Sequence, residues 1–371
     1  MIDIKIYGTG TPGQQLAKSK LVSSLVDANI EYNLTEVNDI SEFIKDGVVS
    51  VPAIKVNDSE LFEIRPNGQY TQSLRECIQG ILKIAKYGTM QQYIVPTDFS
   101  ETSLNAYNYA NQLAKLDGGY INLTHVYYPT SVDVNQYTIL SNEVETVHKS
   151  KLDNYVKSLN QDWFGNFIVE PFVESTFEIG FPKLSIIELS KQNHTSIVMG
   201  TTGEGDTFKK VFGSLTMDLV DECYAPLFLI PPNCYFEAGG IVTYLSEDIK
   251  NDAEHFLYVA DLASKMKSTM RIVHYSKERD DKFNTEDCQA LIKNYYPELD
   301  FNIEIIMTDD VFKQIENEIV GDQNALLAMS TKHRNIFQSF LHKSASEFVA
   351  ANAKIPILIM SDRVKTHLKE A

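Results

Sequence analysis

The sequence predicts an α/β protein of three consecutive units, a short one followed by two that each contain a parallel sheet. Three observations carry this prediction. The 371 residues exceed the length of one ordinary domain. Short apolar runs alternate with stretches at helical spacing, as in strands joined by crossover helices. The pattern of the second unit then recurs in the third. We expect the units at 1–88, 89–233 and 234–371.

The first unit is predicted from an alternating strand at its start and two short strands in succession before its last helix. The expected strands are 3–7, 32–37, 48–56 and 61–64, and the expected helices are 14–28, 41–45 and 70–86. The order of the elements along the chain is therefore β-α-β-α-β-β-α.

The second and third units alternate strands with helices, which implies parallel sheets with right-handed crossovers. In the second unit we expect strands at 93–97, 121–126, 167–172, 196–199 and 227–230, with helices at 104–116, 142–159, 181–192 and 215–223. In the third we expect strands at 240–245, 270–274, 302–307, 325–329 and 356–360, with helices at 253–266, 287–295 and 311–319.

The amino-acid composition limits the classes of partner that we expect and the cellular compartment that suits the protein. The net charge of −17 argues against nucleic acid or an anionic membrane surface as a partner. No apolar run is long enough to span a bilayer, and the first residues alternate like a strand rather than a signal peptide. Four widely spaced cysteines, with no CxxC motif, suit a reduced compartment. We therefore expect a cytoplasmic protein.

The stretch 200–216 predicts an anion-binding loop. It follows a buried strand, contains Gly200, Gly203 and Gly213, and ends at a helix start marked by Ser214. Glycine lets backbone N–H groups approach a phosphate closely, and a helix N-terminus adds donors and a favourable dipole. The loop lies at the carboxyl end of a strand, where open α/β sheets bind ligands.

The spacing Gly-x2-Gly-x9-Gly-Ser, together with 95–101 and 123–126, resembles the ATP-binding branch of the universal stress protein family over about 91–232. The resemblance implies a Rossmann-like domain that binds ATP, with AMP or ADP left open and Mg²⁺ as an optional companion. The implied nucleotide-binding residues are Pro96, Thr97, Asp98, Val126, Met199, Gly200, Gly203, Gly213, Ser214, Leu215 and Thr216. Asp98 would contact the adenosine part, Val126 would border the adenine, and the glycine loop would hold ribose and phosphates.

Asp98 has a plainer alternative role, and three neighbouring residues also bear on the predicted site. Asp98 follows a strand, where aspartate is often only a helix N-cap. His125 is expected to be a packed strand-end residue rather than a catalyst. Glu204 and Asp206 lie within the loop and would repel phosphates unless they face solvent or Mg²⁺.

The third unit resembles a second universal stress domain that has lost its nucleotide. Aligned without a gap on the tail, the glycines become Ser330, His333 and Lys343, while Ser214 stays as Ser344. At the first strand of the unit, Leu245 corresponds to Asp98, with Glu247 and Asp248 just beyond. Larger side chains would then occupy the positions at which the backbone of a nucleotide-binding loop approaches the phosphate. The last strands, 226–230 and 356–360, match, and such domains pair through their last strands. We expect an intramolecular pseudo-dimer, with a homodimer left open.

The first unit presents two alternatives. Gly8, Gly10 and Gly13, with Glu36 on the next strand, match a dinucleotide fingerprint, but the unit is short for a doubly wound domain. The order of its elements favours a thioredoxin fold. The loop resembles the active loop of thioredoxin-like and glutaredoxin-like redox proteins with the cysteines replaced; the degenerate positions are Thr11, Gln14 and the cis-proline candidate Pro52. Without a thiolate at those positions, dithiol exchange has no nucleophile.

Searches for catalytic signatures find no G-x-S-x-G, H-E-x-x-H or G-x-x-x-x-G-K-[ST] motif. No catalytic residue or metal site is therefore predicted. The function expected from the resemblance is adenine-nucleotide-dependent regulation or signalling under stress, through an unidentified protein partner. The alternatives are a slow ATPase and a nucleotide-independent interaction scaffold.

Overall fold

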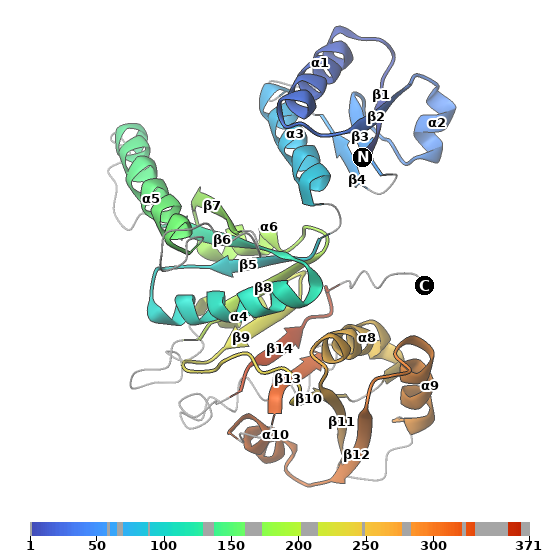
Figure 1. The fold of residues 1–371 in the computed structure, drawn as a ribbon, viewed down its shortest axis with the longest axis vertical. Helices are drawn as coiled ribbons and strands as arrows, with labels where there is room; N and C mark the ends of the chain where they lie inside the picture. The colour runs from blue at the N-terminus through green and yellow to red at the C-terminus, as the bar shows by residue number, and fades with distance from the viewer. Residues whose placement is uncertain are drawn as a thin grey trace. The chain divides into compact units, whose positions relative to one another are not determined.

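A computed structural model describes residues 2–57, 60–64, 70–87, 90–128, 137–159, 173–201, 214–246, 249–276, 283–320, 324–330 and 355–364. The chain divides into two compact units, Met1–Thr89 (unit 1) and Met90–Ala371 (unit 2). Figure 1 shows the elements of both.

In unit 1 the described strands form one sheet in the order β2-β1-β3-β4. β1 is parallel to β2 and antiparallel to β3. Helices α1 and α3 contribute to one hydrophobic core with β1, while Phe43 of α2 belongs to a second cluster. The elements are β1 (Ile2–Tyr7), α1 (Pro12–Asp27), β2 (Tyr32–Val37), α2 (Ile40–Lys45), β3 (Ala53–Val56), β4 (Glu60–Glu63) and α3 (Tyr70–Tyr87).

The element order of unit 1 agrees with the order expected from the sequence, but the third strand is shorter than 48–56. It begins at Ala53, directly after a cis peptide bond between Val51 and Pro52. Proline has no backbone N–H to donate to a ladder, so a strand beginning just after it is the ordinary arrangement.

Unit 2 contains one large sheet, in which the described strands follow the order β12-β11-β10-β13-β14-β9-β8-β5-β6-β7. Its first half consists of β5 (Gln92–Pro96), α4 (Glu101–Asp117), β6 (Tyr120–Tyr127), α5 (Tyr137–Leu159), β7 (Val173–Ile179), α6 (Pro182–Leu189), β8 (Thr195–Gly200), α7 (Ser214–Glu222) and β9 (Leu227–Ile230). Its second half consists of β10 (Ile241–Leu245), α8 (Ile249–Lys265), β11 (Thr269–Ser276), α9 (Thr285–Tyr295), β12 (Phe301–Met307), α10 (Val311–Val320), β13 (Asn324–Ser330) and β14 (Ile357–Met360).

The two halves repeat one strand order and meet at their last strands. β7-β6-β5-β8-β9 corresponds to β12-β11-β10-β13-β14, and the pairs within each half are parallel. At the seam, β9 and β14 pair antiparallel, with Phe228 opposite Leu358. Neither last strand is therefore left as an open edge.

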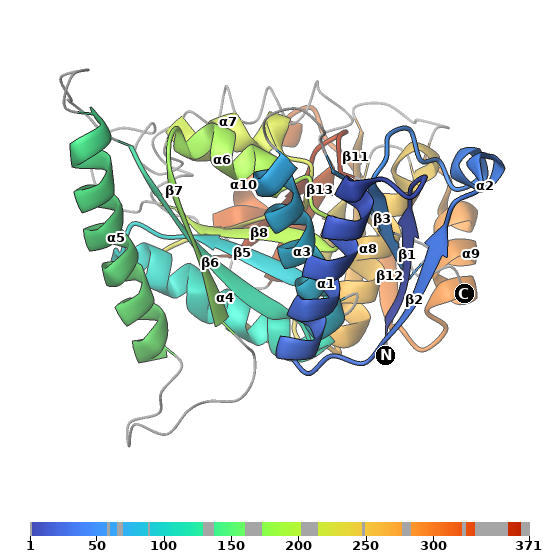
Figure 2. The same cartoon turned by 90° about the horizontal axis from the view of Figure 1, so that it is seen from above.

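Helices cover both faces of this sheet (Figure 2). One core lies between the sheet and α4, α5, α8 and α9, and the other between the sheet and α6, α7 and α10. Both cores contain residues of both halves, so the apolar interior continues across the seam.

The strand that pairs with β6 was not predicted by the sequence pattern. The expected strand at 167–172 lies outside the described residues, and β6 pairs with Val173–Ile179. This strand reads Val-Glu-Ser-Thr-Phe-Glu-Ile and is at the end of the sheet order. An edge strand needs no continuous apolar run, so the more apolar segment before it attracted the prediction.

The seam generates a stability prediction. Phe228 is fully buried, and its ring centroid lies 6.5 Å from that of Tyr109. Phe228→Ala should lower the free energy of unfolding by about 3–5 kcal/mol in urea denaturation, because it leaves a cavity beside the seam. The control Leu184→Ala changes a side chain that is 61% exposed and should stay within about 0.5 kcal/mol. Similar losses in the two variants would contradict a core that continues through the seam.

Candidate functional site

The candidate site lies at the carboxyl ends of β8, β5 and β6. These strands are neighbours and parallel, so their carboxyl ends meet at one edge of the sheet. Beyond the last residues of β5, the Thr97 N–H donates to the Thr124 carbonyl oxygen of β6 at 2.8 Å. Thr97 is buried, and its hydroxyl lies 3.1 Å from that of Ser103. The chain leaving β5 is therefore tied both to β6 and to α4.

Asp98 is held with its carboxylate at the surface. Its Oδ1 accepts a hydrogen bond from the Ser100 N–H at 3.0 Å. The N-cap of α4 is Ser100, whose side chain accepts from the Ser103 N–H at 3.2 Å, so Asp98 is not the cap. Burial works to raise the pKa of Asp98, but hydrogen bonds from the Ser100 side chain and backbone outweigh it and lower that pKa. Asp98 is therefore a fixed carboxylate at neutral pH.

Phe99 contributes to this geometry although the sequence did not single it out. Its φ of 67° is left-handed, which is rare for a bulky residue, and its N–H donates to the Thr97 hydroxyl at 3.0 Å. The Lys151 ammonium lies 3.9 Å from the centroid of the Phe99 ring. Left-handed backbone at a large side chain costs free energy and occurs often at functional sites.

His125 packs behind Asp98 as the sequence suggested, within an aromatic cluster. Its Nδ1 donates to the Thr97 carbonyl oxygen at 2.7 Å. Its ring lies 4.7 Å from Phe99 and stacks on His148 at 5.6 Å between centroids. Its Nε2 is buried and has no hydrogen-bond partner among the described residues. Burial lowers the pKa of His125, and His148 and Lys151 lower it further, against a raising effect of the bond to Thr97.

Gly200, at the end of β8, is required by packing. A Cβ at this position would lie 2.4 Å from the carbonyl oxygen of Thr102 in α4. The preceding Met199 is buried, and its sulfur accepts from the Thr216 hydroxyl of α7 at 3.8 Å. The start of α7 is thereby fixed beside the end of β8.

The structure thus brings most of the predicted residues to one edge. They are Pro96, Thr97 and Asp98 after β5, Val126 near the end of β6, Met199 and Gly200 of β8, and Ser214, Leu215 and Thr216 in the first turn of α7. Gly203 and Gly213, like the acidic Glu204 and Asp206, lie outside the described residues.

The family model described as the universal stress protein family matches residues 90–231. This stretch is a universal stress protein family domain. Its bounds agree with the resemblance expected over about 91–232. No curated protein matches the sequence significantly.

One solved structure of low identity shares this fold, and two others match shorter stretches of the chain. A universal stress protein from Archaeoglobus fulgidus is 19% identical, with 74% of this chain and 97% of that chain covered and a TM-score of 0.54. Universal stress protein UspA from Lactobacillus plantarum is 20% identical over 38% of this chain and 97% of its own, with a TM-score of 0.33. A universal stress protein solved in complex with cAMP is 18% identical over 38% and 95%, with a TM-score of 0.24. At these identities the likeness concerns the fold alone.

The second half of unit 2 repeats part of the geometry of the universal stress domain. His274 of β11 donates from Nδ1 to the Ser246 carbonyl oxygen at 2.9 Å, as His125 does to that of Thr97. Ser246 therefore stands in the place of Thr97, and the next residue, Glu247, lies outside the described residues. This register differs from the expected correspondence of Asp98 with Leu245, because the equivalent histidine bonds reach Thr97 in the first half and Ser246 in the second.

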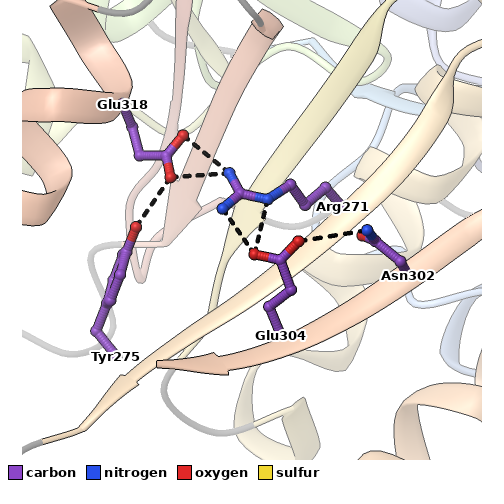
Figure 3. A network of polar contacts seen from close by, with 5 residues as sticks. All are labelled: Arg271, Tyr275, Asn302, Glu304 and Glu318. Carbon is purple, nitrogen blue, oxygen red and sulfur yellow. Dashed lines mark hydrogen bonds and ion pairs between the residues drawn. The ribbon is translucent and has the colours of Figure 1, made fainter. Parts of the chain in front are cut away.

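The second half also differs from the universal stress domain at this edge. The place of Val126 is taken by Tyr275, which is 7% exposed and whose hydroxyl donates to Glu318 of α10 at 3.0 Å. Arg271 binds both oxygens of Glu318, at 2.8 and 2.9 Å, and also holds Glu304 (Figure 3). At the place of Gly200, the Ser330 hydroxyl lies 2.9 Å from Nδ1 of the buried His255.

In unit 1 the predicted degenerate positions are occupied by structural side chains. Thr11 is the N-cap of α1 and accepts from the Gln14 N–H at 3.3 Å. Gln14 is fully buried, and its Oε1 accepts from the Gly10 N–H at 2.7 Å. A Cβ at Gly8 would lie 2.4 Å from that oxygen, so Gly8 makes room for Gln14.

Two further residues of unit 1 bear on its chemistry. Glu36, the acid of the dinucleotide alternative, forms an ion pair with Lys18. Burial raises the pKa of Cys77 to about 12, so this thiol stays protonated at neutral pH.

Within the described ranges, no three His, Cys, Asp or Glu side chains are grouped so as to hold a metal ion. In the same part of the chain, no helix has both the length and the apolar character needed to cross a bilayer.

The close approach of Thr102 to Gly200 predicts that alanine at position 200 lowers the stability of the protein. Gly200→Ala should destabilise unit 2 by about 1–3 kcal/mol in urea denaturation, because the new Cβ would meet backbone rather than a side chain that can move. Gly180→Ala is the matched control: it also follows a strand, but its Cβ would meet only Ser185 Oγ at 3.8 Å. The control should change stability by less than about 1 kcal/mol. A neutral Gly200→Ala would show that α4 can shift away.

His125 predicts a pH dependence. Because its pKa in the folded state lies below its ordinary value of 6.5, the unfolded chain binds this proton first as the pH falls. Its contribution to stability is present above pH 6.5 and is lost below it, by at most about 1.4 kcal/mol per pH unit. The free energy of unfolding should therefore fall less steeply between pH 7 and 5 in His125→Gln than in the wild type. Equal slopes would contradict a depressed pKa.

Proposed function

We propose that the universal stress domain, residues 89–233, binds an adenine nucleotide and that its occupancy regulates contacts with a protein partner. The observation that carries the proposal is the gathering of Asp98, Val126, Gly200 and the first turn of α7 at one edge of the sheet. The family match over 90–231 supports it independently. ATP is the first candidate, with AMP and ADP as alternatives, and Mg²⁺ would accompany a triphosphate.

Each element has a physical task in this proposal. The fixed carboxylate of Asp98 offers acceptors to the hydroxyl or amino groups of adenosine. Val126, partly exposed, offers an apolar border for the base. The N-terminus of α7 supplies N–H groups and a positive dipole end for phosphates. Gly203 and Gly213 would complete the phosphate cradle. Since the whole chain carries −17, phosphate binding would depend on such local donors.

The second half of unit 2 is proposed to be a second universal stress domain, residues 234–371, without a nucleotide. The side chains Ser330, His333 and Lys343 in place of glycines support this, as does Tyr275 in place of Val126. Its role would be to pair with the first domain through β9 and β14 as an intramolecular pseudo-dimer. Whether two chains associate further is left to measurement.

Residues 1–88, which lie within unit 1, are proposed to form a thioredoxin-like domain without redox activity. The sheet order β2-β1-β3-β4 and the cis Val51–Pro52 bond are consistent with this. Thr11 and Gln14 provide no thiol, and Cys77 has a raised pKa. Protein interaction is its remaining function. The four described cysteines are buried free thiols, which fits a reducing, cytoplasmic location.

Thermal stability with ATP–Mg²⁺ tests the nucleotide proposal. At a hundred times Kd, ATP should stabilise the wild type by about 2.7 kcal/mol, and Asp98→Ala and Gly213→Val should abolish most of the shift. Asp39→Asn is a matched control, because Asp39 accepts from the Ser41 N–H at 2.8 Å as Asp98 does from that of Ser100. It should keep the full shift. No shift in the wild type would favour the scaffold alternative.

The slow ATPase alternative is distinguished in the same samples. Steady phosphate release by the wild type that disappears in Asp98→Ala would establish it. Binding of ATP without phosphate release would support a regulatory role for the bound nucleotide.

A further inference from the structure

A cavity of about 590 Å³ lies at the opposite end of β8 from the candidate nucleotide edge. It is placed before the first residues of β5, β8 and β9 and after the last residues of β14. The six residues of β8 separate it from Gly200 by roughly 17–20 Å of extended chain. Its volume is in the ordinary range for small-molecule sites. Its walls include Gln91, Lys191, Tyr224, Pro226, Tyr258, Asp362 and Arg363.

Two cations in this cavity face one aromatic ring. The Lys191 ammonium and the Arg363 guanidinium each lie 5.5 Å from the centroid of Tyr224. Lys191 also pairs with Glu188 at 2.5 Å on the exposed side of α6. No carboxylate pairs with the Arg363 guanidinium among the described residues. Positive charge gathered beside a ring is notable in a chain of net charge −17.

The polar groups around these cations are held in place. The Tyr224 N–H donates to the Ser190 hydroxyl at 3.0 Å, which fixes the backbone of Tyr224 to the end of α6. On another wall, the Gln91 amide donates to Ser196 Oγ at 3.0 Å, and the same oxygen lies 3.0 Å from the Tyr258 hydroxyl. A cavity with fixed polar groups, aromatic surface and two cations has the features of a built binding site.

Both halves of unit 2 supply its walls. Gln91, Lys191 and Tyr224 come from the first half, and Tyr258 and Arg363 come from the second. A molecule bound here would contact both sides of the β9–β14 seam and would stabilise their pairing by binding the folded state alone.

We propose that this cavity is a second ligand site, which takes a small organic anion with a compact planar body. Its carboxylate or phosphate group lies against Arg363 and Lys191, because guanidinium and ammonium groups bind such anions by charge-assisted hydrogen bonds. Its planar body lies against Tyr224 and Pro226. Arg363, with which no carboxylate of the described residues pairs, selects anions over neutral molecules of the same shape.

Titration calorimetry of the full chain with benzoate and with phenyl phosphate tests the site and separates its two anion classes. We expect at least one probe to bind at millimolar concentration or tighter, and the neutral benzyl alcohol to bind at least roughly tenfold more weakly. The probe that binds more tightly identifies carboxylate or phosphate as the natural group. Failure of both anions, or equal binding of benzyl alcohol, would overturn the proposal.

Variants locate the bound probe. Arg363→Gln and Lys191→Gln should each weaken it by roughly tenfold. Lys115→Gln makes the same charge change at an exposed position of α4 outside the cavity and should leave binding within about twofold. Equal weakening by Lys115→Gln would mean that only the overall charge matters, which contradicts the site.

The nucleotide site is tested separately. Probe affinity should be unchanged in Asp98→Ala and in the presence of saturating ATP–Mg²⁺. Loss of probe binding in either case would place the probe at the nucleotide edge and overturn the proposal. If ATP itself fails to bind while the probes bind as expected, the nucleotide proposal fails and the cavity stands.

Discussion

The antiparallel pairing of β9 with β14 is the contact on which the architecture of unit 2 depends. A parallel half-sheet of five strands would otherwise end in an apolar edge, since all residues of β9 and β14 are buried. Pairing the two edges satisfies their backbone groups and joins two half-cores into continuous layers on both faces. Ser361 extends the junction, because its hydroxyl donates to the Cys223 carbonyl oxygen at 2.6 Å across the halves.

The two halves share their strand order, but the residues at the carboxyl ends of their strands differ. Both keep the contact between a strand-end histidine and the carbonyl of the preceding strand, as His125 and His274 show. The first half then needs glycine at 200 because α4 approaches closely. The second half has a serine at the equivalent place and directs its hydroxyl to His255. In the second half, Tyr275 also takes the place of Val126, so the same strand order carries different side chains at its carboxyl edge.

The sequence predicted most of the strands and helices because buried parallel strands are short apolar runs between amphipathic stretches. It placed β2 and β9 at the bounds found in the structure. It did not predict β7, where the polar composition of an edge strand hides the signal. It also opened α4 too late, at Leu104, because Ser100 caps the helix ahead of the first apolar residue.

The sequence predicted which residues gather at the candidate site, but not the contacts that hold them there. Motif spacing identified Asp98 and Gly200, whereas the left-handed Phe99 and the ring stack of His125 on His148 depend on tertiary contacts that no local pattern encodes. The role of Gly200 shows the difference: the motif suggested room for a phosphate, and the structure adds a backbone contact with Thr102 that needs glycine without any ligand. The cavity beside Tyr224 was invisible to the sequence because its walls come from segments as distant as Gln91 and Arg363.

Helix α7 links the two ends of β8 physically. It begins at Ser214 beside the candidate nucleotide edge and ends at Glu222, two residues before Tyr224 of the cavity. Its nine residues span about 13 Å. Lys183 of α6 clamps it along one side, at 3.4 Å from Asp218 and 2.9 Å from Glu222. No residue of α7 lines the cavity, which agrees with the expectation that the nucleotide and the cavity ligand bind independently.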